Sequence, residues 1–158
     1  MNGLHLEGGL DNWSKWVKWS DRKTLTGINY PGVYAIVVSD DKIDGTSFKC
    51  IPEIAYFGMT NSKGGLRSRL KQFDNTISGK DGHGGARRFR KKYPKYDSLI
   101  KRLYVAIRPF ECDSSSILPK DLLIKGKVAE YEYICFAEYV KRVGQLPEFN
   151  DMKRSPKG

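Results

Sequence analysis

Short apolar runs alternate with polar, glycine-rich and basic stretches along the 158-residue chain. Three of these runs are rich in β-branched and aromatic residues and predict β-strands: Val33–Val38, Ile54–Met59 and Leu103–Ile107. Periodic or basic segments between them predict helices from about residue 66 to residue 73, with a possible extension to Ile77, and over residues 86–93, where Pro94 ends the helix. The pattern predicts an α+β domain with a small antiparallel three-stranded sheet flanked by helices.

A last, longer helix is expected over residues 127–143, with Gly144 as its stop signal. At about 100° per residue, its apolar positions form one stripe: Val128, Cys135, Phe136, Tyr139 and Val143. Glu132 falls in the middle of this stripe, whereas Glu130 and Glu138 fall on other faces. A buried carboxylate is costly unless it is paired or binds a metal. Glu132 is therefore either the partner of an arginine such as Arg69 or a ligand for a hard divalent cation.

Two tyrosine motifs, Gly32-Val33-Tyr34 and Tyr56-Phe57-Gly58, lie in the first two expected strands. Strand alternation places Tyr34 on the face of Ile36 and Val38, and Tyr56 on the face of Ile54 and Gly58. If the two strands pair as a hairpin, both tyrosines can point the same way. Two hydroxyls with nearby glycines could hold a water and a phosphate, although packed strand tyrosines are the plainer alternative.

The helix after the second motif carries Arg67 and Arg69, and helical geometry alone barely separates them. Either arginine could brace a phosphate, because the planar guanidinium matches phosphate oxygens. The plainer alternative is a solvated helix charge.

The order Gly-Val-Tyr, Tyr-Phe-Gly and Leu-Arg-Ser-Arg-Leu resembles the GIY-YIG endonuclease superfamily over about residues 31–150. The family carries a catalytic arginine followed by an aliphatic residue, which matches Arg69. It also carries a metal-binding glutamate in a later helix, matched by Glu132 on helix face and by Glu138 on sequence distance. The family's closing asparagine matches Asn150. Where many members have histidine or tyrosine, this chain has Phe73, so that role falls to His83 unless His83 is a plain surface residue.

The resemblance implies hydrolysis of a DNA phosphodiester with Mg²⁺ (or Mn²⁺) held by Glu132. It also implies that Tyr34 or Tyr56 positions or deprotonates the attacking water, and the sequence does not rank the two. A free phenol has a pKa near 10, so a phenolate would need nearby cations: Arg69, Lys63 or the metal.

The formal net charge of +10 favours a polyanionic partner, DNA first. The candidate nucleic-acid-binding residues are Lys63, Arg67, Lys71, Arg87, Arg88, Arg90, Lys91 and Lys92, with a merely solvated basic face as the alternative. No apolar stretch approaches the roughly 20 residues that cross a bilayer, and no membrane partner is expected. Three widely spaced cysteines and the lack of a signal-peptide pattern favour the cytoplasm.

Three regions are expected: an extension (1–30) whose tryptophans pack on the core, the nuclease-like domain (31–150) and a tail (151–158). Loops at 39–52 and 75–95 could read bases, which favours a restriction-type enzyme over a repair or mobile-element nuclease. A homodimer is one way to cut both strands. The competing interpretation is a non-catalytic nucleic-acid-binding module of the same fold.

Overall fold

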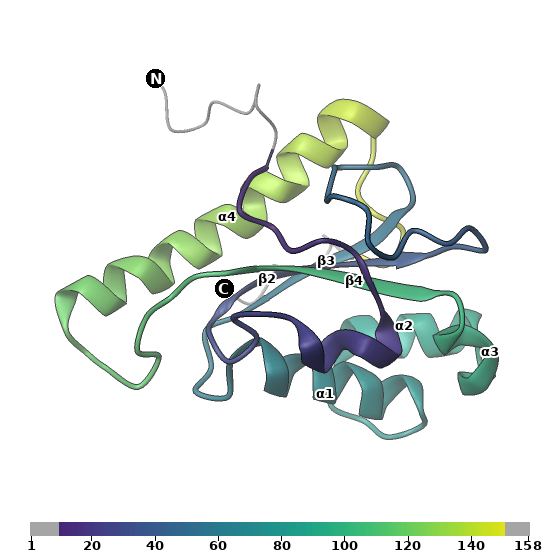
Figure 1. Ribbon diagram of the computed structural model, residues 1–158, viewed down its shortest axis with the longest axis horizontal. Coiled ribbons are helices and arrows are strands. Elements are labelled where there is room, and N and C mark those ends of the chain that lie inside the picture. Colours follow the sequence, from purple (N-terminus) through teal and green to yellow (C-terminus); the bar gives the residue numbers. More distant parts are fainter. Residues whose placement is uncertain (1–9, 151–158) are drawn as a thin grey trace.

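Four antiparallel strands form the centre of the protein, in the spatial order β1–β4–β2–β3. They are Val17–Lys18 (β1), Gly32–Val38 (β2), Ile54–Thr60 (β3) and Leu103–Pro109 (β4). The structure is a computed structural model that describes residues 10–150 (Figure 1). The α+β class is confirmed, but the expected count of three strands is wrong. The additional strand, β1, is only two residues long and has no alternating pattern that would reveal it; its pairing with β4 defines it.

The helices are η1 (Trp19–Thr24, a 3₁₀ helix), α1 (Gly65–Ile77), α2 (Gly84–Lys92), α3 (Tyr96–Ile100) and α4 (Pro119–Val143). The sequence did not suggest α3, and α4 begins well before residue 127. Pro119 suits this earlier start, because a proline at the first helical position has no N–H to leave unpaired. Gly144 ends α4 as expected, in a left-handed conformation with φ of 92°. Within the described residues, no helix is long and apolar enough to cross a membrane.

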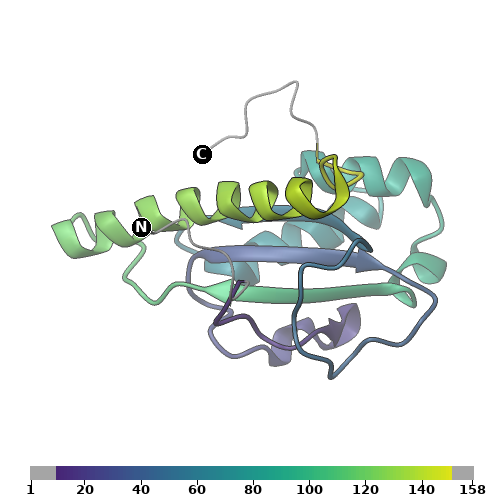
Figure 2. The ribbon, with the colours of Figure 1, turned by 90° about the horizontal axis from the view of Figure 1, so that it is seen from above.

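The helices cover both faces of the sheet. Figure 1 shows α4 on one face and α1, α2 and α3 on the other, and Figure 2 shows α4 running in roughly the same direction as the strands. Each face has its own hydrophobic core. Trp16 is buried in the core under α4 and Trp19 in the core under α1 and α2. Trp16 and Trp19 are therefore buried as expected, and Trp13 is partly buried against the core under α4. Their spacing does not mark one helix face, because the chain between Trp16 and Trp19 is strand β1.

The register of the β2–β3 hairpin brings both tyrosines to the face under α1 and α2. Tyr34 pairs with Gly58, and Ile36 pairs with Tyr56. An irregularity after Ile36 then sets Val37 opposite Ile54. Ile54 consequently packs under α4, so the expectation that it shares a face with Tyr56 is wrong.

Candidate active site

The two tyrosines lie side by side in a closely packed cluster. Their ring centroids are 6.1 Å apart, Tyr34 is fully buried and Tyr56 nearly so. Glycines make room for both rings: a Cβ at Gly58 would collide with the Tyr34 ring, and one at Gly85 would lie 2.5 Å from Cζ of Tyr56. The glycine of the second motif and the first turn of α2 are thus shaped around these two side chains.

His83 joins the cluster from the N-terminus of α2. Its Nδ1 accepts a hydrogen bond from the Ala86 N–H (3.2 Å), so His83 is the N-cap residue of α2. Its Nε2 lies 2.7 Å from the Tyr34 hydroxyl. Because Nδ1 is an acceptor, a neutral ring carries its proton on Nε2 and donates it to the Tyr34 oxygen. His83 is only 1% exposed, so the alternative of a plain surface histidine is wrong.

The surroundings keep His83 neutral. Burial, together with the charges of Arg69 and Arg88, lowers the pKa of His83 to about 3. A neutral donor to the Tyr34 oxygen favours the phenolate form of that tyrosine. In this tautomer His83 does not accept the proton of Tyr34, so it orients and stabilises rather than acting as a base.

The tyrosine hydroxyls are held in their neutral form in the protein alone. Burial raises the pKa of Tyr34 well above its ordinary value and also raises the pKa of Tyr56. The charge of Arg69 lowers both pKa values, and the charge of Glu132 raises them. Added positive charge is therefore needed before either phenol could serve as a base near neutral pH.

The two arginines of α1 point to different parts of the protein. The charge of Arg69 acts on Tyr34, Tyr56 and Glu132, which places its guanidinium at the cluster. Its Nη1 also donates to Gln72 Oε1 (2.8 Å). By contrast, Arg67 Nε donates to Asn29 Oδ1 (2.8 Å), in the segment before β2. The structure thus brings Arg69, and not Arg67, to the tyrosines.

Glu132 approaches the same cluster from α4, which packs mainly along the edge strand β3. Glu132 is 6% exposed, and within residues 10–150 no cation lies within 4 Å of its carboxylate to form an ion pair. Burial raises its pKa to about 7, although the charge of Arg69 opposes this shift. The competing candidate, Glu138, is buried against Arg142 in an ion pair one turn apart. Glu132 is the carboxylate that lacks a partner.

A divalent metal bound to this carboxylate would need further ligands from water or substrate. Residues 10–150 contain no group of three or more histidine, cysteine or acidic side chains that could hold a metal ion. Mg²⁺ and Mn²⁺, however, prefer oxygen ligands, and Mg²⁺ commonly keeps several waters while binding one or two carboxylates and substrate phosphates. A buried Glu132 without an ion-pair partner in the described residues, whose charge acts on both tyrosines, suits that mode of binding.

Asn150 supports the second tyrosine motif through the backbone. Its Oδ1 accepts from the Phe57 N–H (3.0 Å) and its Nδ2 donates to the Phe57 carbonyl (2.9 Å). Phe149 N–H also donates to the Ala55 carbonyl (3.0 Å). The Asn150 amide therefore takes the place of a neighbouring strand at the free edge of β3 and fixes the residue between Tyr56 and Gly58.

Replacing Asn150 with aspartate is expected to destabilise the protein by about 1–3 kcal/mol, because a carboxylate accepts from Phe57 but does not donate to it. Urea unfolding at pH 7 measures the change. Asn29→Asp is the matched control, since Asp keeps the acceptor that Arg67 uses. Equal unfolding midpoints for both variants would show that the edge contact is unimportant.

Many of the basic residues expected to bind nucleic acid already have partners within the protein. Arg90 donates to the carbonyls of Thr76 and Lys80, both at 3.0 Å. Arg87 pairs with Asp81 at 3.5 Å, and Lys92 pairs with Glu148 at 2.6 Å. Lys63, Lys71 and Lys91 are exposed. The basic surface over α2 thus presents less free charge than its sequence suggests.

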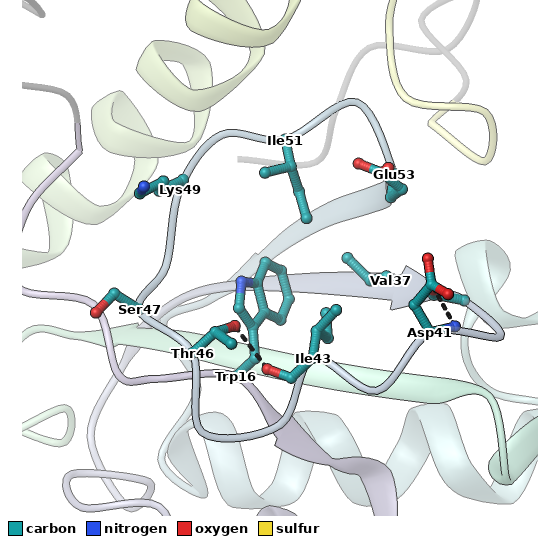
Figure 3. A pocket seen from close by; sticks show the side chains of 10 residues that line it. Trp16, Val37, Asp41, Ile43, Thr46, Ser47, Lys49, Ile51 and Glu53 are labelled. Atoms are coloured by element: carbon teal, nitrogen blue, oxygen red, sulfur yellow. Dashed lines mark hydrogen bonds between the residues drawn. The ribbon is translucent and has the colours of Figure 1, made fainter.

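A cavity of about 490 Å³ lies elsewhere, under the loop that joins β2 and β3 (Figure 3). Trp16 and Val37 form part of its wall, and both belong to the core under α4, on the opposite face from the tyrosines. Two polar side chains of the loop form hydrogen bonds within the loop itself: Ser39 Oγ accepts from the Asp41 N–H, and Thr46 Oγ1 donates to the Ile43 carbonyl. The cavity has no catalytic set and is separate from the tyrosine cluster.

No family model, no curated protein and no solved structure matches this chain. The chemistry of the cluster therefore has to be inferred from its own residues.

Low pH is expected to destabilise the protein through His83. Its pKa is about 3 when folded against 6.5 in the reference state, so the unfolded chain binds more protons below pH 6.5. The loss should reach about 2 kcal/mol at pH 5. His83→Asn keeps a capping side chain and removes this titration, so its unfolding free energy should fall less between pH 7 and pH 5. The other histidine provides the control, His5→Asn, which should behave like the parent; a parental pH dependence in His83→Asn would contradict the argument.

Proposed function

We propose that this protein is a metal-dependent endonuclease that hydrolyses DNA phosphodiester bonds with a GIY-YIG-type active site. The observation that carries the proposal is the convergence on two strand tyrosines of three groups from three separate helices. These groups are Arg69 from α1, the neutral His83 at the start of α2, and the unpaired Glu132 from α4. A packing cluster has no need of an unpaired buried carboxylate, whereas phosphoryl chemistry does use such a group.

In this mechanism Tyr34 is the tyrosine that orients the attacking water. Tyr34 first loses its own proton to solvent when added positive charge favours the phenolate, and the phenolate then takes the proton of the water. Tyr34 is favoured over Tyr56 because its oxygen receives the His83 Nε2 proton donor, which stabilises a phenolate. Arg69 lies on the same side and neutralises charge that develops on the phosphate oxygens. Glu132 would hold Mg²⁺ or Mn²⁺, which when bound would polarise a non-bridging or leaving oxygen.

DNA is the proposed substrate because the chain carries a net charge of +10 and an exposed set of lysines near the cluster's helices, including Lys63, Lys71 and Lys91. A restriction-type role in the cytoplasm is the preferred biological setting. The 39–52 loop and the segment 75–95, which contains α2, are the base-reading candidates. Cleavage of both strands would require a homodimer or two separate encounters, which analytical ultracentrifugation with and without DNA distinguishes.

The purified protein incubated with plasmid DNA, with Mg²⁺ or with EDTA, tests the proposal on a gel. Discrete fragments with Mg²⁺ alone indicate a restriction enzyme, and a smear indicates a nonspecific nuclease. Intact DNA with a mobility shift would favour the non-catalytic binding module and overturn the proposal. Tyr34→Phe and Tyr56→Phe rank the two hydroxyls, because each removes one oxygen and keeps the ring; Tyr34→Phe should be the more damaging.

A further inference from the structure

The first turn of α2 packs its backbone directly against Tyr56. A Cβ at Gly85 would lie 2.5 Å from Cζ and 2.7 Å from the hydroxyl oxygen of Tyr56. Arg88 follows Gly85 by three residues, so it lies on the same helix face. Helical side chains lean toward the helix N-terminus, and here Gly84 and Gly85 have no side chains of their own in that turn. This lean favours an Arg88 side chain that lies near the turn in contact with Tyr56.

One contact fixes the direction of the Arg88 guanidinium. Its Nε donates to the Phe149 carbonyl (2.8 Å), in the segment that closes the edge of β3. Within residues 10–150 its two terminal amino groups have no hydrogen-bond partner, and the side chain is half-buried. Arg90, on the same helix, instead has two carbonyl partners. The Arg88 Nε is thus engaged within the protein, whereas its two terminal amino groups can donate to a ligand.

The charge of Arg88 reaches the tyrosine cluster. It lowers the pKa of Tyr56 and of His83, and Arg69 does the same from α1. The charges of two guanidinium groups from two helices therefore act on one cluster. No acidic side chain within residues 10–150 forms an ion pair with either of them. Two cations without carboxylate partners suit an anion that is brought by a ligand.

We propose that Arg88 is a second phosphate-binding arginine, which contacts an oxygen of the phosphate group with its terminal amino groups while the Phe149 carbonyl holds its Nε. The inference rests on the proposed function only for the source of the phosphate, a DNA backbone. Arg69 and Arg88 then contact the phosphate from two helices. Through Phe149, Arg88 also connects the phosphate site to the segment that contains Asn150.

The competing role for Arg88 is structural, as a brace between α2 and Phe149. Arg88→Met keeps most of the aliphatic stem and removes both the charge and the Nε contact. Arg102→Met is the matched control, because Arg102 also uses its Nε within the protein, toward Asp40, and its guanidinium lies over the ring of Tyr93. Thermal melts of both variants measure the structural contribution separately from phosphate binding.

Phosphate binding is read at His83 without any cleavage. The sequence contains only two histidines, so the Cε1–Hε1 NMR signals of His83 and His5 are assigned with a single His5→Gln variant. Inorganic phosphate is added at constant pH and ionic strength without divalent metal. The His83 signal should shift saturably in the parent and in Arg102→Met, and the apparent affinity should fall at least about tenfold in Arg88→Met. Arg88→Lys should lie between them, because it keeps charge and loses the fork.

The outcomes separate this inference from the proposed function. No saturable shift of His83 in the parent, or an unchanged one in folded Arg88→Met, would overturn the phosphate-binding role of Arg88. If Arg88→Met fails to fold, a parental affinity in Arg88→Lys would overturn it equally. A phosphate shift that depends on Arg88 in a protein that never cuts DNA would support the anion site and reject the nuclease. DNA cleavage by Arg88→Met at the parental single-turnover rate would support the nuclease and reject the phosphate-binding role of Arg88.

Discussion

Arg69→Ala is expected to slow single-turnover DNA cleavage by about two to three orders of magnitude, the usual effect of removing a preorganised charge from a transition state. Arg69 acts on Tyr34, Tyr56 and Glu132 together, so its loss removes positive charge from the proposed base and from the phosphate at once. The rate is measured with enzyme in excess and saturating, so that weaker DNA binding does not contribute. Arg69→Lys should recover only part of the rate, because an ammonium lacks the planar fork.

Arg67→Ala is the comparison for this experiment. Arg67 stands two residues earlier on the same helix, and its Nε is engaged by Asn29. Its loss should weaken DNA binding and its salt dependence, but leave the saturated rate within a few-fold of the parent. A larger loss of rate in Arg67→Ala than in Arg69→Ala would mean that the arginine has been wrongly assigned.

The regular parts of the fold could be predicted because their residues encode them locally. The β-branched run Val33–Val38 and the apolar run Ile54–Met59 lie within β2 and β3, and Gly144 ends α4. Strand β1 could not be predicted, because two residues have no period and only β4 gives them a partner. The irregularity after Ile36 was equally hidden, since it is a property of the pairing between two strands.

At the site, too, the sequence predicted what depends on local periodicity and did not predict what depends on contacts between distant residues. The stripe on the last helix singled out Glu132, because helical periodicity is a local property. The sequence could not separate Arg67 from Arg69, since the contact with Asn29 joins residues far apart in the chain. It also could not select Arg88 from a run of basic residues. The glycine pair before Arg88 was the available signal, because adjacent glycines at a helix start indicate a close approach of the backbone to another group.

Glu132→Gln is expected to stabilise the metal-free protein while abolishing cleavage that depends on Mg²⁺. The carboxylate is buried and has no cation partner within the described residues, so its charged form is poorly compensated. Glutamine has nearly the same shape and carries no charge. It should therefore keep the fold and DNA binding, although an amide is a far weaker ligand for a hard cation.

The expected stabilisation depends on pH in a defined direction. The pKa of Glu132 is about 7 in the folded protein and 4.5 in the reference state, so the folded protein binds more protons between these values. Its contribution is fully favourable below pH 4.5 and is lost as the pH rises through 7. At pH 8 the charged carboxylate should cost on the order of 3 kcal/mol. Glu132→Gln should thus match the parent near pH 4 and exceed it increasingly toward pH 8.

Urea unfolding from pH 4 to pH 8, with and without Mg²⁺, measures both effects on one variant. Added Mg²⁺ should stabilise the parent at pH 8 and leave Glu132→Gln unchanged, because only the parent has the anionic ligand. Glu138→Gln is the matched control, since Glu138 is also buried but has Arg142 as an ion-pair partner, so its neutralisation should not stabilise the protein. A destabilised Glu132→Gln that still cuts DNA would exclude Glu132 from the site and transfer the metal to Glu138.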